Sequence, residues 1–414
     1  MRCEDEKKSV VRLYCLFQFF FPLLLWLPVF YEYQKRMGLS DPQIFSIQSF
    51  YYLAFFFLEI PTGAFADLWG CRLSLRLGAL TLVAANLLPV FWVSYGGFMT
   101  HFFLIALARS FVSGASNAYL YDFLKSRHCE SEYKQIEGNA RAYGLIGKVV
   151  CWAGIGALMK WHITLPYWIT AVFAFISLLV VKKLPEQPVH AAVAAGNAVT
   201  SPGAYFSKHL FPVLRILRTS PFLVLLMLQG IGIFVLARIC QVNLYQPILG
   251  DKHFDLVSYG WIMSLMTLFE ALGSARHNWT RRYISDVDAV SALTILIAAS
   301  LSWMACAGKA GTMAALFLFA YVTGLAYPIQ RQALNDAITN SRYRATLLSM
   351  ESLVDRGICA WVVTFIAPFV ADGRTGVFLN ISSAATVVFT AVLFYIIRKV
   401  RRRAVSIPRA SVEG

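Results

Sequence analysis

The sequence predicts an all-α polytopic membrane protein with about twelve transmembrane helices. Of its 414 residues, 58% are hydrophobic and only 14% are charged. The mean hydropathy is +0.60. Apolar stretches of roughly 20 residues, the length that spans a bilayer, recur along the whole chain. A soluble protein of this length could not bury so much apolar surface.

The predicted spans fall into two groups of six, separated by the longest break in the hydrophobic pattern. The first group covers residues 13–33, 44–66, 72–93, 99–124, 135–159 and 164–181. The second group covers residues 221–245, 254–275, 287–306, 312–338, 346–370 and 376–397. We therefore divide the chain into an N-terminal half (1–181), a cytoplasmic linker (182–220), a C-terminal half (221–398) and a basic tail (399–414). The linker turns amphipathic over 205–218, as a helix lying on the membrane surface would.

Positive charge is distributed unevenly between the loops. The formal net charge is +15, and most lysines and arginines fall at the ends of spans that would face the cytoplasm if the N-terminus does. Examples are Lys7, Lys8, Arg12, Lys125 and the run from Arg398 to Arg403. This positive-inside bias places both termini in the cytoplasm. The charge is thus explained by topology and lipid headgroups, and no nucleic-acid partner is needed.

Ionisable residues inside the spans avoid every third helix. The third, sixth, ninth and twelfth spans carry none, and a charge at the bilayer centre costs about 2.5–3.5 kcal/mol on insertion scales. The charge-free spans are therefore expected to face lipid, as in a fold of three-helix repeats. The remaining charges are Glu59, Arg109, Lys148, Arg238, Glu270, Arg331, Glu351, Asp355 and Arg356.

The seam between the second and third spans reads EIPTGAFADLWGCRLSLRLG, from Glu59 to Gly78. It resembles the signature loop of major facilitator superfamily transporters, G-x-x-x-D-R-x-G-R-R. Leu68 and Cys71 stand where that pattern has basic residues. The residues that fit it are Gly63, Asp67, Gly70, Arg72 and Arg76.

Two further stretches extend the resemblance over nearly the whole chain. SGASNAYLYDFLK, at residues 113–125, is similar to the end of helix 4 in a bacterial branch of the superfamily. YPIQRQALNDAITNSRYRATLLSMESL, at residues 327–353, is similar to the matching end of helix 10, with its Arg-Ala-Thr-x-x-Ser element.

The resemblance implies the major facilitator fold, with two pseudo-symmetric six-helix halves built from inverted three-helix repeats. It also implies a monomer in the bacterial inner membrane, a central cavity and alternating access. In such a protein the loop containing Asp67 acts as a conformational switch, with Asp67 near the start of helix 11. The alternative is a static anchor of the loop.

Four residues are candidates for proton coupling: Glu59, Arg109, Glu270 and Asp355. A desolvated carboxylate gains affinity for protons, so its protonation could follow the opening of a cavity. Arg109 resembles the helix-4 arginine of antiporters in the superfamily. The alternative for each residue is a fixed ion pair or an internal polar network.

Deep cations and amides are candidates for substrate contacts. Lys148 and Arg238 could attract an anionic substrate, although carboxylates more often neutralise such residues. The candidate substrate-binding residues are Asn117, Tyr121, Lys148, Gln229, Arg238 and Asn243.

The leading functional prediction is a secondary active transporter, a proton-coupled antiporter that exports a small organic compound. The sequence has no phosphate-binding G-x-x-x-x-G-K-[ST] loop and no H-E-x-x-H motif. We therefore expect no enzyme activity, metal or cofactor. Residues 144–156 keep Gly147, Gly154 and Gly156 but lack the proline typical of drug antiporters. Proton-coupled uptake of a small metabolite, with an anion as a candidate, thus remains the alternative.

Overall fold

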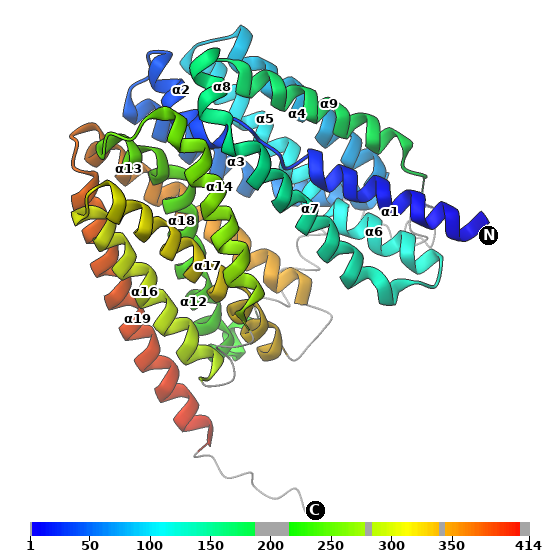
Figure 1. Ribbon diagram of the computed structural model, residues 1–414. Coiled ribbons are helices and arrows are strands. Elements are labelled where there is room, and N and C mark those ends of the chain that lie inside the picture. The colour runs from blue at the N-terminus through cyan, green and yellow to red at the C-terminus, as the bar shows by residue number, and fades with distance from the viewer. Residues whose placement is uncertain (1, 187–214, 278–283, 339–343, 406–414) are drawn as a thin grey trace, which may run out of the picture. The chain divides into compact units, whose positions relative to one another are not determined.

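The computed structural model describes residues 2–186, 215–277, 284–338 and 344–405. Within these ranges every regular element is a helix, which confirms the all-α prediction (Figure 1). The predicted surface helix over 205–218 and the end of the predicted tail lie largely outside the described residues.

The first predicted span is not one continuous helix. Helix α1 (Arg2–Phe20) ends before Pro22, and the chain resumes as the short η1 (Leu27–Val29) and α2 (Phe30–Arg36). Pro22 has no backbone N–H and clashes with the preceding turn, so a helix cannot run through it without a kink. The prediction of one continuous span over 13–33 was therefore wrong. The residues around Pro22 are apolar, so the hydrophobic pattern gives no sign of the break.

The other spans of the first group are helical close to where they were predicted. They correspond to α3 (Asp41–Trp69), α4 (Cys71–Phe91), α5 (Tyr95–Ser113) with α6 (Ala115–Ser126), α7 (Tyr133–Ala153) with α8 (Ile155–Trp161), and α9 (Leu165–Lys183).

The second group of spans is also helical in the structure. Its first member consists of α12 (Pro221–Arg238), a π-helical turn η3 (Ile239–Leu244) and α13 (Tyr245–Asp251). The others are α14 (Leu256–Ala275), α16 (Asp286–Cys306), α17 (Lys309–Ala337), α18 (Arg344–Ala371) and α19 (Thr375–Val405).

Ten helices in the described ranges are long and apolar enough to cross a membrane. An eleventh span results if α7 and α8, which meet at a bend of 42°, are counted together. Helix α1 is not among them, since its first residues are strongly polar and Pro22 follows its end. The count of twelve therefore stays a prediction.

The chain forms two compact units. Unit 1 comprises Met1–Pro202, Val242–Thr267 and Arg356–Gly373, and unit 2 comprises Gly203–Gln241, Leu268–Asp355 and Arg374–Gly414. Unit 1 thus contains parts of three helices from the second group of predicted spans. These compact units do not test the predicted division into two six-helix halves, which stays a prediction.

An aromatic core stabilises unit 1 beside the break after α1. Trp26 is buried, donates its indole N–H to Oδ1 of Asn86 over 2.7 Å, and stacks on Tyr167 with ring centroids 5.7 Å apart. His101 packs edge-on against Trp26 and contacts the carbonyl of Ala85 through Nδ1 at 2.6 Å. These contacts join the broken first segment to α4, α5 and α9, and they satisfy polar groups that burial would otherwise penalise.

Polar contacts within unit 1 connect the first group of helices to α13 and α14. Oε1 of Gln246 accepts the backbone N–H groups of Tyr31 and Glu32 at 3.0 and 3.1 Å. Nζ of Lys160 lies 3.4 Å from Oδ2 of Asp255, just before α14. The backbone N–H of Val257, and then Lys160, lower the pKa of the Asp255 carboxyl.

Reciprocal glycine contacts bring helix backbones together in both units. In unit 1, Gly156 lies against the carbonyl of Leu256, and Gly260 lies against the carbonyl of Trp152. In unit 2, Gly273 on α14 lies against the carbonyl of Tyr321, and Gly324 on α17 lies against that of Glu270. A Cβ atom at any of these glycines would collide with backbone, so we call these two pairs the glycine contacts.

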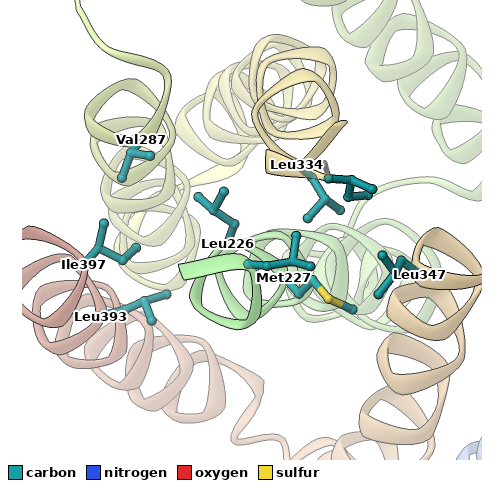
Figure 2. Close-up of a cluster of buried hydrophobic side chains, with 9 residues drawn as sticks. Leu226, Met227, Val287, Leu334, Leu347, Leu393 and Ile397 are labelled. Carbon is teal, nitrogen blue, oxygen red and sulfur yellow. The ribbon is translucent and has the colours of Figure 1, made fainter. Parts of the chain in front are cut away.

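Unit 2 has its own apolar core, built where α12, α16, α17, α18 and α19 converge (Figure 2). Leu226 and Met227 of α12 lie at its centre. In a membrane, where lipid is as apolar as these side chains, van der Waals packing between the helices stabilises such a core. The core also contains Leu223, Val287, Leu334, Ile338, Leu347, Leu393 and Ile397.

We predict that Gly324→Ala destabilises the protein. The new methyl group would collide with the backbone of α14, and overpacking of this kind costs about 1–3 kcal/mol. The melting temperature of the detergent-solubilised protein should fall accordingly. Gly138→Ala is the matched control, because Gly138 on α7 has nothing within 4 Å of its added Cβ position. Equal melting temperatures for the two variants would contradict the importance of the glycine contact.

Candidate functional site

The side chains of the candidate site in unit 1 lie along one face of α3. Tyr51, Phe55 and Glu59 are spaced four residues apart, so they lie one above another on the helix. Each contacts a cationic side chain, as described below. We call these three residues the α3 stripe.

Glu59 is held between a hydroxyl and a guanidinium. Oγ of Ser113 donates to Oε1 of Glu59 over 3.5 Å, and Oε2 lies 3.7 Å from Nε of Arg356. In the described part of the chain Oε2 is buried and makes no hydrogen bond. The ion pair with Arg356 is therefore long, and the side chains of Arg356 and Glu59 are only 13% and 17% exposed.

Arg356 also packs on the second member of the α3 stripe. Its Cζ atom lies 3.4 Å from the centroid of the Phe55 ring, a cation–π contact. The guanidinium of Arg356 therefore keeps a contact in unit 1 that does not depend on the charge of Glu59.

Arg109 contacts the first member of the α3 stripe. Its Nη1 donates to the hydroxyl of Tyr51 over 3.1 Å. Among the described residues no carboxylate lies within ion-pairing distance of Arg109, and its side chain is exposed. Two guanidinium groups, those of Arg109 and Arg356, thus lie against the α3 stripe.

A buried amide network lies near the stripe in unit 1. Asn243, in the η3 turn, accepts the hydroxyl proton of Tyr52 over 3.0 Å and donates its amide to Oε1 of Gln48. Asn243 was a predicted substrate contact, and in the structure its side chain connects η3 to α3.

The other substrate candidates of unit 1 lie on α6 and α7. Lys148 is half-buried, with Nζ 5.7 Å from the centroid of the Trp152 ring. Tyr121 is exposed and meets Tyr133 edge-on at 5.6 Å, and Asn117 is half-buried on α6. The structure does not bring these three residues into the α3 stripe through any described contact.

Unit 2 holds two tightly paired carboxylates on α18. Nη1 of Arg331 lies 2.5 Å from Oε2 of Glu351, and Nη2 of Arg238 lies 2.7 Å from Oδ2 of Asp355. Glu351 is fully buried and Asp355 is 2% exposed. Gly230 on α12 provides room for this network, since a Cβ there would collide with the side chain of Glu351. Both carboxylates are compensated, as buried charges must be.

The remaining candidates of unit 2 also have defined contacts. Oε2 of Glu270 accepts the side-chain amide of Gln241 over 3.1 Å. The amide of Gln229 donates to the carbonyl of Val287 and to Oγ of Ser291, at 3.1 and 2.9 Å. Gln229 therefore joins α12 to α16, a role that sequence reasoning did not anticipate.

The signature loop contacts the end of α9. Gly70 takes the positive φ of 92° that ends α3, and Arg72 pairs with Glu186 at 2.5 Å. Arg72 and Arg76 also donate to the carbonyl of Lys182, at 2.9 and 3.4 Å, where cations complement the helix C-terminus. Gly63 and Asp67 lie on α3, and both are exposed. The expected contact of Asp67 with helix 11 stays a prediction.

Several residues of the site were not predicted as such. Tyr51 and Phe55 could have been found from their spacing to Glu59, and Ser113 from its place in the helix-4 motif. Glu186 lies outside the predicted spans, so no pattern singled it out. In the described part of the chain, no group of three or more His, Cys, Asp or Glu side chains could hold a metal ion.

The sequence matches the family model of the Major Facilitator Superfamily over residues 11–354. The chain belongs to this superfamily. It is therefore a multi-span membrane protein and a secondary transporter, not an enzyme. A comparison with curated proteins finds no match.

Solved structures of several transporters share the fold. The nucleoside transporter NupG is 17% identical, with a TM-score of 0.69 over 95% of this chain and 98% of that one. The peptide transporter POT in complex with sulfate is 15% identical, with a TM-score of 0.71 over 95% and 94%. A D-xylose-proton symporter is 12% identical, with a TM-score of 0.72 over 93% and 96%. At such identities the likeness shows the fold alone.

We predict that Arg331→Met lowers the stability of this superfamily member sharply, because it leaves Glu351 charged and buried. Losing one partner of a buried pair costs roughly 3–5 kcal/mol. Adding Glu351→Gln to Arg331→Met should restore much of the thermal stability measured in detergent.

The control for this pair is Arg398→Met. The side chain of Arg398 is 55% exposed, and its Nη2 lies 3.5 Å from Oδ1 of Asp288. Exposed pairs contribute little. If Arg331→Met were as stable as this control, the buried pair would have no structural role.

Proposed function

We propose that the chain is a proton-coupled exporter of a small organic compound that works by alternating access, with Glu59 as the coupling carboxylate. The observation that carries this proposal is the long ion pair between Glu59 and Arg356. The arginine nitrogens lie 2.5 and 2.7 Å from Glu351 and Asp355, so these two ion pairs are short. Glu59 lies 3.7 Å from Nε of Arg356, and the Coulomb attraction on its charge is weaker at this distance.

The chemistry of a cycle follows from the contacts of the α3 stripe. When Glu59 is ionised, it attracts Arg356 of α18, and this attraction holds α3 and α18 together in unit 1. A proton on Glu59 removes the attraction, while the contact of Arg356 with Phe55 persists. Protonation would thus weaken the α3–α18 contact without releasing a bare cation into an apolar region.

Asp355 and Glu270 take secondary positions in this proposal. Asp355 forms an ion pair with Arg238 at 2.7 Å, and Glu270 accepts the side-chain amide of Gln241 at 3.1 Å. Both contacts are shorter than the 3.7 Å ion pair of Glu59. Arg109 binds the substrate and takes no part in proton coupling. Its lack of a carboxylate partner among the described residues supports a substrate with a negatively charged or strongly polar group.

Uptake by proton symport is the second candidate, and the guanidinium of Arg109, which pairs with no described carboxylate, favours it for an anionic metabolite. A D-xylose-proton symporter shares the fold, which is compatible with coupling to protons in either direction. In both versions we place a monomer in the bacterial inner membrane with both termini in the cytoplasm, as the positive-inside bias indicates. The signature loop, with Asp67 and Arg72, would act as its conformational switch.

The direction of transport is tested by expression in an efflux-deficient bacterium. Cells would be challenged with toxic compounds and metabolites, with and without a protonophore. Export predicts resistance and lower intracellular accumulation, both lost with the protonophore. Increased sensitivity or gradient-dependent accumulation would instead establish uptake. Arg109→Ala should lose the effect in either case, because the substrate contact is removed.

The coupling role is tested with Glu59→Gln in proteoliposomes that carry a pH gradient. Once the expression screen has named a substrate, gradient-driven transport of it should be lost, because a glutamine amide cannot take up and release the coupled proton. Exchange of labelled for unlabelled substrate, which needs no net proton transfer, should continue.

Glu32→Gln is the matched control, since Glu32 pairs with Arg36 at 2.7 Å near the surface of unit 1. It should transport normally. Normal gradient-driven transport in Glu59→Gln would remove the coupling assignment, while loss of exchange as well would indicate a structural role for Glu59.

A further inference from the structure

Two aromatic rings and a guanidinium group form a surface in unit 2 to which the proposed transport cycle gives no role. Phe234 lies on α12 and Tyr327 lies on α17, with their ring centroids 5.2 Å apart and their planes tilted by 50°. Cζ of Arg331 lies 5.1 Å from the centroid of the Phe234 ring and 5.6 Å from that of the Tyr327 ring. We call Phe234, Tyr327 and Arg331 the aromatic shelf.

The aromatic shelf follows from one spacing that occurs on both helices. An aromatic residue precedes an arginine by four positions at Phe234 and Arg238 on α12, and again at Tyr327 and Arg331 on α17. Residues four apart share one face of a helix. Because α12 and α17 pack against each other (Figure 1), the two faces bring the rings into contact.

The guanidinium of the aromatic shelf is held in place by a buried carboxylate. Nη1 of Arg331 lies 2.5 Å from Oε2 of Glu351, whose side chain is fully buried, while the side chain of Arg331 is 26% exposed. A guanidinium is planar, so it can lie against aromatic rings and donate hydrogen bonds in its own plane. Arg331 has N–H donors and no acceptor. The shelf therefore offers hydrogen-bond donors whose charge is already compensated by Glu351.

The ring of Tyr327 is the accessible part of the aromatic shelf. Its side chain is 44% exposed, and it is the only exposed side chain over residues 315–331, all of which the structure describes. Among the ten membrane-spanning helices of the described chain, α17 is the most enclosed, with 61% of its most apolar stretch buried. A partly exposed guanidinium beside the ring is strongly unfavourable against lipid. This environment favours contact of the ring with water or a dissolved ligand over contact with lipid.

We propose that the aromatic shelf binds an uncharged, planar aromatic ring of the transported compound. The ring stacks on Tyr327, and a carbonyl oxygen attached to it accepts an N–H of Arg331. This inference rests on the proposed transport function and names one part of the substrate. Aromatic rings attract one another in offset-stacked and edge-to-face arrangements. Because Arg331 only donates, it selects an acceptor, and because Glu351 compensates it, an anion gains little there over a neutral carbonyl.

Benzamide is the probe, since it joins a planar ring to a neutral carbonyl group. Its binding to the purified full chain in detergent is measured by titration with saturation-transfer nuclear magnetic resonance. Cyclohexanecarboxamide is of similar size but lacks a flat aromatic face, so it should bind roughly three- to tenfold more weakly. Benzamidinium replaces the carbonyl with a cationic donor, so it should also bind more weakly. Equal binding of benzamidinium would overturn the assignment of a neutral acceptor.

The role of the exposed ring is tested with Tyr327→Leu, which keeps an apolar side chain and removes the aromatic face. Benzamide should bind this variant roughly three- to tenfold more weakly than the unaltered chain. Its preference over cyclohexanecarboxamide should disappear. Tyr327→Phe keeps the ring and should bind benzamide as the unaltered chain does.

Tyr395→Leu is the matched control, because Tyr395 is a 66% exposed tyrosine of α19 that is not part of the aromatic shelf. It should leave benzamide binding unchanged, and circular dichroism and gel filtration show whether each variant is folded. The proposal is overturned if benzamide does not bind the unaltered chain or binds folded Tyr327→Leu equally well. An equal loss in the control would also overturn it, by showing that benzamide binds exposed rings without selection.

The binding assay needs no gradient, so its outcome is separate from that of the Glu59 experiments. Benzamide binding through Tyr327 in a chain that transports nothing would keep the aromatic shelf as a binding site and overturn the transport function. Conversely, Tyr327→Leu could be as active as the unaltered chain toward every aromatic compound that the expression screen names. That result would overturn the aromatic shelf as a substrate site and leave the transport function standing.

Discussion

An ionised side chain inside a membrane needs a partner, and this requirement determines how the polar groups of the chain are arranged. A charge left alone at the centre of a bilayer costs several kcal/mol, so each one is retained only where a neighbour compensates it. In unit 2 the requirement is met by short contacts, from Arg331 to Glu351 and from Arg238 to Asp355. In unit 1 it is met more loosely, by the long pair of Glu59 and Arg356 and by the aromatic ring of Phe55. In the proposed function, the tightly paired carboxylates maintain the fold, and Glu59 is the carboxylate whose charge changes.

Backbone N–H and C=O groups inside a membrane also need partners. Oγ1 of Thr170 accepts the backbone N–H of Leu25 in the segment after α1, and Oε1 of Gln246 accepts the backbone N–H groups of Tyr31 and Glu32 at the start of α2. Breaks in transmembrane helices expose backbone groups that lipid cannot satisfy. Here neighbouring side chains from distant parts of the sequence provide the hydrogen bonds. These hydrogen bonds replace part of the backbone pairing that a continuous helix would provide.

Much of the architecture could be predicted from the sequence, because the hydrophobic effect acts on local stretches of chain. Apolar length located most of the helices, and the signature loop identified the superfamily that the family model then confirmed. The break at Pro22 was missed, since a window of apolar residues averages over it. The pairing of charges was also beyond the sequence: Glu351 and Asp355 share a face of α18, but only the fold selects Arg331 and Arg238 as their partners. Gln229 shows the same limit. The sequence does not reveal that its amide donates to Ser291 of α16.

The glycine contact between α8 and α14 has a consequence for motion. Gly156 and Gly260 let the two backbones touch directly, so no rotamer is fixed where each glycine meets the opposing chain. Ordering a long side chain costs up to about 2 kcal/mol in conformational entropy, and a glycine surface avoids that cost. If α8 and α14 separate in the proposed transport cycle, the two glycine positions have no side-chain rotamer of their own to reorder when the backbones meet again.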